Sequence, residues 1–306
     1  MGRYAWRKIW GVVLTAVLVS LLTFFIVQVL PGDPALLMIG MEGSPEAYAR
    51  LRRELDLDKP AFERYLRWAA NYMQGDWGVS WRYSLPVREL VSQAFPLSLS
   101  LAMIAVGVAL VVAIPTGIYM AAKPESWGSR MLSVGTQVGL GLPQFWVGLL
   151  LIQLFAVTFN IFPAGGSSTW VSLVLPTITL ALPRAAILSR FMRVGIAEAL
   201  KQDYIRTAKA KGVKASTVFF KHALRNGSLG VVTVAGLQFS QLLAGTIVVE
   251  QVFGLPGLGQ LLLTGVFQRD LPLVQAVCML VVILILLFDL VFDLFLGALD
   301  PRIRYE

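Results

Sequence analysis

The part of this sequence best suited to chemistry is Asp203–Asn226, which reads DYIRTAKAKGVKASTVFFKHALRN. Its cationic side chains suit a surface that contacts a partner protein and not a catalytic centre. Phe219 and Phe220 add apolar bulk, and we expect one to pack internally and the other to enter a partner's pocket. The alternative for the charges is lipid headgroups and membrane topology. The cationic residues are Arg206, Lys209, Lys211, Lys214, Lys221 and Arg225.

The same stretch is expected to form two short helices. Gly212 can adopt the left-handed conformation that ends the first helix. Ser216 or Thr217 could cap the second helix, and Asn226-Gly227 could end it. A structured basic loop of this kind predicts a docking surface for another protein.

A second set of candidates consists of polar residues inside long apolar runs. Such residues are costly in lipid, so each is a candidate for a translocation path, although interhelical hydrogen bonding is the alternative. Arg184 is expected to form a structural ion pair with Asp289 or Asp293, which lie one helical turn apart. The path candidates are Gln137, Gln153, Gln238, Gln241, Asp289 and Asp293.

The elements that must position these residues are membrane helices. The chain has 306 residues, of which 57% are hydrophobic and 14% charged, whereas about 25% are charged in a typical soluble domain. The net charge of +8 does not indicate nucleic-acid binding, because the charges flank apolar runs. Each run is about the 20 residues that a spanning helix needs. We predict six spans: Ile9–Leu30, Leu97–Ala121, Leu132–Phe159, Val171–Phe191, Leu229–Val249 and Leu273–Leu296.

The distribution of Lys and Arg orients these spans. With both termini in the cytoplasm, residues 192–228 carry 8 Lys or Arg and residues 160–170 carry none, which is the positive-inside pattern. Residues 31–96 also carry 8 but lie outside, because long segments cross largely regardless of charge. The expected divisions are residues 1–30, an outer helical cap at 31–96, and a core at 97–306 that contains the loop 193–228.

Within the outer cap, three short helices are expected. Ser44-Pro45-Glu46 is a helix-start signal, an amphipathic run follows from Pro60 to Met73, and Pro86–Gln93 could begin a third helix. The cap is either a lid or a contact surface for a partner that delivers substrate. We favour the contact surface, with Asp76, Trp77 and Trp81 as its candidates.

The sequence resembles a known family at several motifs. Arg206-Thr207-Ala208, Gly212 and Leu224 follow the spacing of the EAA loop of ABC-importer permeases, although Arg206, Thr207, His222 and Arg225 depart from its usual residues. The whole chain is similar to the B-type membrane subunit of dipeptide, oligopeptide and nickel importers. The further matching segments are Pro31–Pro34, Leu55–Pro60, Gly75–Gly78, Pro143–Gly148, Glu250–Gly259, Arg269-Asp270 with Pro272, and Leu299–Arg304.

This resemblance implies an all-α type I permease with six transmembrane helices in the bacterial inner membrane. It also implies a heterodimer with a second permease, two cytoplasmic ATPases and an extracytoplasmic solute-binding protein. ATP and Mg²⁺ would bind the ATPases, since this chain has no G-x4-G-K-[ST] motif. The expected ATPase-coupling residues are Asp203, Tyr204, Arg206, Thr207, Ala208, Lys209, Gly212, His222 and Leu224.

The leading prediction is therefore a permease subunit for short peptides, with no catalytic residue, metal site or bound cofactor of its own. The single histidine and single cysteine argue against a dedicated nickel site. Nickel, glutathione, an opine or an oligosaccharide remain alternative solutes. A gradient-driven secondary transporter is the alternative of a different class, but it would leave the docking loop unexplained.

Overall fold

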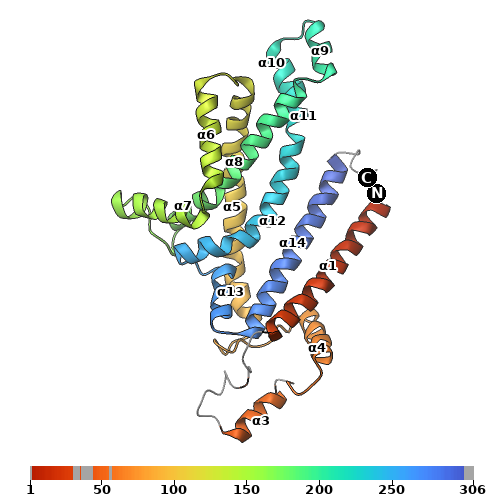
Figure 1. The fold of residues 1–306 in the computed structure, drawn as a ribbon, viewed down its shortest axis with the longest axis vertical. Helices are drawn as coiled ribbons and strands as arrows, with labels where there is room; N and C mark the ends of the chain where they lie inside the picture. Colours follow the sequence, from red (N-terminus) through yellow and green to blue (C-terminus); the bar gives the residue numbers. More distant parts are fainter. Residues whose placement is uncertain (1, 30–34, 36–43, 55–56, 300–306) are drawn as a thin grey trace. The chain divides into compact units, whose positions relative to one another are not determined.

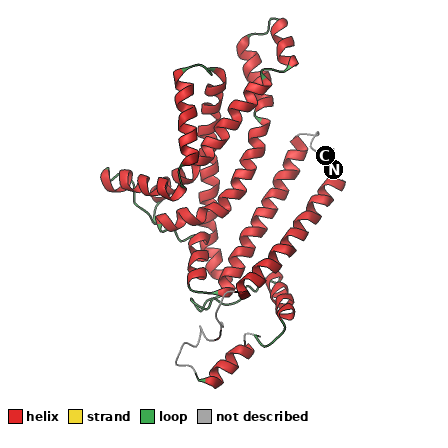
Figure 2. Ribbon diagram, viewed as in Figure 1, coloured by secondary structure: helices red, strands yellow, loops and turns green. Residues whose placement is uncertain are grey.

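The computed structural model describes residues 2–29, 35, 44–54 and 57–299. These residues form helices joined by turns (Figure 2). One isolated antiparallel bridge joins Val79 and Pro86. The chain divides into two compact units, Met1–Phe95 with Leu261–Glu306, and Pro96–Gln260. We call these the terminal unit and the central unit.

In the terminal unit, the first and last long helices pack along each other (Figure 1). Lys8 near the start of α1 forms a 2.6 Å ion pair with Asp293 near the end of α14. The two helices therefore run antiparallel. The helices of this unit are α1 (Gly2–Val29), α3 (Pro45–Glu54), α4 (Ala61–Met73) and α14 (Leu271–Leu299), with parts of α5 (Val87–Ala122) and α13 (Leu258–Phe267).

The outer segment contributes two of the three expected short helices. The Ser44 side chain caps α3 by accepting a 3.2 Å hydrogen bond from the Ala47 amide, as predicted. Helix α4 packs on α1, where Tyr65 is buried and its hydroxyl lies 2.8 Å from Ser20 Oγ. The third short helix is wrong as a separate element, because α5 continues without a break through Pro96 to Ala122.

The central unit is built around α8, which packs against α6, α7, α11 and α12. Its helices, besides its part of α5, are α6 (Trp127–Gly141), α7 (Gln144–Leu151), α8 (Val174–Ala199), α9 (Asp203–Ala210), α10 (Ala215–Thr217), α11 (Arg225–Gly227) and α12 (Leu229–Phe253). Two π-helical segments, Ile152–Thr158 and Val218–Leu224, and a 3₁₀ turn at Trp170–Leu173 complete it.

Four of the described helices are long and apolar enough to cross a membrane: those in the ranges Trp6–Phe25, Val87–Ala122, Trp170–Ala199 and Leu271–Gly297. Two bent pairs raise the number to six if each pair counts as one span. The third expected span is not one straight helix, because the chain bends by 108° at Pro143 between α6 and the segment Gln144–Thr158. Proline removes the backbone donor that would continue α6.

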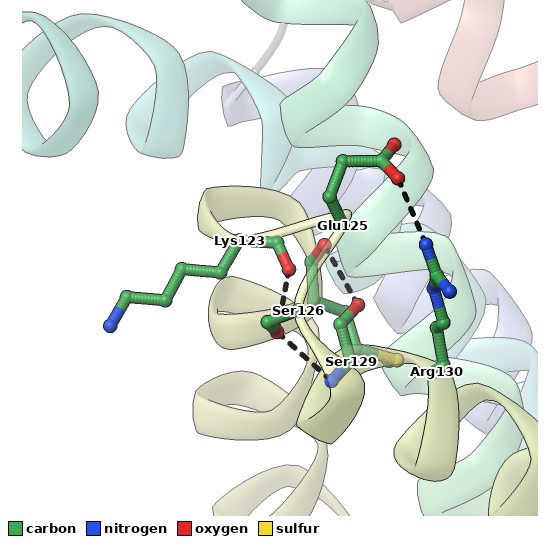
Figure 3. Close-up of polar contacts among 6 residues, drawn as sticks. Lys123, Glu125, Ser126, Ser129 and Arg130 are labelled. Atoms are coloured by element: carbon green, nitrogen blue, oxygen red, sulfur yellow. Dashed lines mark hydrogen bonds and ion pairs between the residues drawn. The ribbon is translucent and has the colours of Figure 1, made fainter.

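The turn between α5 and α6 is held by local polar contacts (Figure 3). Ser126 Oγ donates to the Lys123 carbonyl at 2.9 Å and accepts from the Ser129 amide at 3.2 Å, so it caps α6. Arg130 and Glu125 form an exposed ion pair at 3.3 Å. Ion pairs this exposed contribute little stability. The Ser126 N-cap therefore contributes more to the stability of this turn.

Helices α8 and α11 meet at two glycines. A Cβ on Gly227 would lie 2.7 Å from the Gly195 carbonyl oxygen, closer than real side chains approach. Helix α11 ends at Gly227, as expected, although Ser228 keeps helical backbone angles and α12 begins at Leu229. Gly227 is needed because the backbones of α8 and α11 approach closely at this point. In the sequence alone, this tertiary requirement cannot be told from a helix-end signal.

Candidate functional site

Helix α9 presents the expected docking residues to solvent. Asp203, Tyr204, Arg206, Thr207 and Lys209 are exposed, and Ala208 is half-buried. Ile205 is 1% exposed and anchors the helix. Arg206 pairs with Asp203 one turn earlier at 3.5 Å, while Thr207 Oγ1 donates to the Asp203 carbonyl at 3.0 Å.

Gly212 ends this first helix as predicted. Its φ is +74°, in the left-handed region that favours glycine. The Gly212 amide donates to Lys209 O at 3.0 Å, and the Val213 amide donates to Ala208 O at 3.2 Å. These bonds satisfy carbonyls at the helix end and turn the chain into the next segment.

The second docking helix begins differently from the prediction. Lys214 is its N-cap and makes no side-chain cap bond, so neither Ser216 nor Thr217 caps it. The chain then passes through the π-helical turn Val218–Leu224. Phe220 is 60% exposed while Phe219 is half-buried, in line with one ring packing inward and one remaining available. His222 and Leu224 are also half-buried.

The docking helices lie toward one end of the central unit. Figure 1 shows α9 and α10 at the same end of that unit as the turn between α5 and α6. Lys123 of that turn and Arg130 of α6 are exposed. The docking loop and this basic turn, which joins the second and third expected spans, therefore share one end of the unit.

The path candidates are placed in different environments. Gln238 is buried at 6% exposure, and its side-chain oxygen has no hydrogen-bond partner among the described residues. Asp289 and Asp293 are half-buried on α14. The remaining three, Gln137, Gln153 and Gln241, are exposed.

The expected ion pair of Arg184 with Asp289 or Asp293 stays a prediction. The Asp293 carboxylate pairs with Lys8 of α1 within the terminal unit. Arg184 lies on α8, and its Nε is buried with no hydrogen-bond partner within the described part of the chain. Sequence reasoning treated Arg184 as structural and did not single it out as a site residue.

The outer candidates are partly used for packing. Trp77 stacks on Tyr72 with ring centroids 5.3 Å apart, and the Asp76 carboxylate accepts from the Gly78 amide at 3.0 Å. Asp76 remains exposed, and Trp81 is half-buried. Burial raises the pKa of the Tyr72 hydroxyl well above its usual range. It therefore stays protonated and donates to the Ala276 carbonyl at 3.3 Å.

Two buried acidic residues were not identified from the sequence. Asp270, 1% exposed, accepts hydrogen bonds from Ser80 Oγ and from the amides of Arg82 and Leu273, and so ties the turn after α4 to the start of α14. Glu250 plays the same part in the central unit. Its carboxylate accepts from Ser98 Oγ at 2.6 Å and from the Gly259 amide at 2.7 Å. Both lie in segments that resemble the permease family, Glu250–Gly259 and Arg269-Asp270. That resemblance was the sequence signal that could have identified them.

Comparison with known proteins identifies the family. Residues 113–305 match the model of the binding-protein-dependent transport system inner membrane component, and residues 1–102 match the N-terminal model of the same membrane component. The chain belongs to the binding-protein-dependent transport permeases. The resemblance to ABC-importer permeases is thereby confirmed.

The relatives of this permease include glutathione transporters. It is 38% identical over 306 residues to the glutathione transport system permease protein GsiC of Escherichia coli K12, with 100% of each chain covered. GsiC of Shigella dysenteriae serotype 1 gives the same identity and coverage.

Solved structures support the fold of this permease. The MetNI methionine ABC transporter, in inward-facing conformations, matches with a TM-score of 0.59 at 18% identity, covering 69% of this chain and 96% of the other. An amino acid ABC transporter with histidines matches with a TM-score of 0.55 at 19% identity, covering 68% and 92%. At this identity the likeness concerns the fold alone.

The permease is therefore a membrane-embedded transport subunit of an ABC importer and not an enzyme. Subunits of such importers act with a second permease, ATPases and a binding protein. The exposed basic helix α9 and the exposed Phe220 are suited to protein docking.

Proposed function

We propose that this permease forms, with a homologous second permease, the translocation path of an ATP-driven importer for short peptides of tripeptide size, glutathione included. The observation that carries the solute class is the full-length identity of 38% to a glutathione permease. Glutathione is itself a tripeptide, so this relative and the peptide-importer motifs favour the same chemical class.

The coupling role is assigned to α9 and the turn after it. Asp203, Tyr204, Arg206, Thr207, Lys209 and Gly212 are exposed on one projecting segment, and they would contact a cytoplasmic ATPase. His222 and Leu224 would support this segment from the second helix. Coupling requires that the ATPases bind the two permease states with different free energies. ATP and Mg²⁺ would be bound by those ATPases, with both ends of this chain in the cytoplasm of a bacterial inner membrane.

On the outer side, Asp76 and Trp81 would contact the binding protein, with Trp77 holding the turn against Tyr72. In the membrane, Gln238 and the half-buried Asp289 and Asp293 would lie near the path. The exposed Gln137, Gln153 and Gln241 would face the second permease or the path itself. The expected division into residues 1–30, 31–96 and 97–306 describes these roles along the chain.

The test is uptake by a strain that lacks this chain, with and without the gene supplied on a plasmid. Labelled glutathione, labelled tri-alanine and labelled nickel are compared. Restorable loss of glutathione or tri-alanine uptake supports the proposal. Loss of nickel uptake alone would replace peptide with nickel as the solute.

A further inference from the structure

Arg184 is a cation placed deep in a membrane helix. It lies ten residues after Val174, the first residue of α8, which is about 15 Å along a helix. In the span that contains it, 56% of an 18-residue apolar window is buried, whereas the share is between 11% and 33% in the other three straight spans. A charge at this depth is costly unless it faces a partner or an aqueous path.

The guanidinium of Arg184 has unused hydrogen-bonding capacity. Nε is buried without a hydrogen-bond partner among the residues that the structure describes, and arginine has no neutral form at ordinary pH. Nε and Nη2 form one edge of the guanidinium, the edge that binds a carboxylate through two parallel hydrogen bonds.

Gly245 of α12 leaves space on this edge. A Cβ built on Gly245 would lie 3.4 Å from Arg184 Nη2 and 3.9 Å from Gln144 Oε1. The guanidinium of Arg184 and the side-chain amide of Gln144 therefore both approach the position that a side chain at residue 245 would occupy. Gln144 follows Pro143 directly, so the bend between α6 and α7 sets its place.

A second unsatisfied group lies on the same helix pair. Gln238 precedes Gly245 by about two helical turns on α12 and is 6% exposed. Helices α8 and α12 pack together. The Gln238 side-chain oxygen has no hydrogen-bond partner in the described part of the chain. One buried donor on α8 and one buried acceptor on α12 thus have no partner among the described residues, although α12 bends by 52° between Gln238 and Gly245. Such open buried groups are rare unless a further molecule satisfies them.

We propose that Arg184 binds a carboxylate of the transported solute, with the amides of Gln144 and Gln238 positioning the rest of a peptide. This rests on the function proposed above and names the residue that recognises the solute inside the membrane. Nε is buried in this structure, so the carboxylate reaches it only when the packing around Arg184 opens. Such opening belongs to the alternation between states that import requires.

The first test uses the complete transporter, with both permeases, the ATPases and the binding protein, in proteoliposomes supplied with labelled reduced glutathione or tri-alanine. Arg184→Gln should lower uptake at least about tenfold, the effect of losing a charge-assisted hydrogen-bond pair. Arg184→Lys keeps the charge and should retain more uptake than Arg184→Gln. Arg190→Gln is the matched control, because Arg190 is exposed on the same helix.

A second variant separates the loss of the solute site from a failure to fold. Gly245→Ala places a methyl group at ordinary contact distance from its neighbours, so the packing is kept while the space beside Arg184 is filled. It should assemble normally and lower uptake, with a larger rise in KM than fall in maximal rate. Normal assembly with normal uptake would count against the site.

A third measurement separates solute binding from a structural ion pair with the second permease. Gly245→Cys, which places a thiol beside the intact Arg184, is made in a Cys278→Ala background, since Cys278 is the only cysteine of this chain. Modification of the introduced thiol by a cationic thiosulfonate should occur during ATP turnover and should be slowed by tri-alanine but not by its C-terminal amide. A Gly245→Cys variant that is never modified, or that tri-alanine does not protect, overturns the proposal.

The two proposals fail in different ways. Wild-type transporter that imports neither glutathione nor tri-alanine rejects the proposed function, and the role of Arg184 falls with it. Wild-type transporter that imports either solute, together with an Arg184→Gln variant that imports it equally well, rejects only the carboxylate site.

Discussion

Ser98 Oγ donates a 2.6 Å hydrogen bond to the carboxylate of Glu250, and the two residues are 152 positions apart. Ser98 also accepts a 2.8 Å hydrogen bond from the Leu258 amide, the first residue of α13. The Glu250 carboxylate accepts two more bonds, from the amides of Gly259 and Gln260. One buried pair therefore connects α5, α12 and the start of α13.

Removing this carboxylate should destabilise the central unit. Glu250→Ala leaves Ser98 and two amides without their acceptor, and each unsatisfied buried group costs about 1–3 kcal/mol. Glu250→Gln keeps one acceptor oxygen and should lose less. The measurement is the thermal unfolding midpoint of the purified complex, with Glu198→Gln as the exposed control on α8. An unchanged midpoint for Glu250→Ala would contradict the structural role.

Replacing Gly212 should affect coupling more than folding. A left-handed residue with a Cβ costs about 1–2 kcal/mol, and open space surrounds this position. Gly212→Val should remain in the membrane but lower both solute-stimulated ATP hydrolysis and uptake. Gly212→Asn is the matched control, because asparagine tolerates this conformation best. Full coupling in Gly212→Val would remove the docking role of this turn.

The exposed ring of Phe220 should anchor the ATPase. A buried aromatic anchor at an interface is worth about 2 kcal/mol or more, so Phe220→Ser should weaken binding of the ATPases roughly thirtyfold. Copurification of the ATPases with the two permeases reports this loss. Phe267→Ser serves as the control, since Phe267 is 77% exposed on α13. Equal copurification of both variants would show that Phe220 is not an anchor.

The pair of Lys8 and Asp293 should act mainly as a link between α1 and α14. The side chains are 43% and 36% exposed, and pairs of this exposure contribute about 0.2–1 kcal/mol. Asp293→Lys should lower the unfolding midpoint slightly, and adding Lys8→Asp should restore it, as a double-mutant cycle measures. The competing prediction is a required charge on the path. In that case Asp293→Asn abolishes uptake and the exchanged pair does not restore it.

Local sequence determined much of the helical layout. Runs of about 20 apolar residues predict spans, because backbone groups in lipid must be satisfied within a helix. The cap at Ser44 and the left-handed Gly212 also followed from sequence, since both depend on the conformation of one residue and its neighbours. The motifs of the docking loop further indicated the family, because they are short runs of adjacent residues.

Features that depend on distant partners could be known only from the three-dimensional packing. Pro143 lies at the break between two helices while Pro96 lies within one, and Gly227 allows a close approach to Gly195 besides lying at the end of α11. Asp293 pairs with Lys8, 285 positions away, and Arg184 keeps a buried Nε without a hydrogen-bond partner among the described residues. Which segments are helical and apolar follows from nearby residues and can therefore be predicted from the sequence. Which charged and polar groups meet, and which stay without a partner, depends on packing between residues that are far apart in the chain.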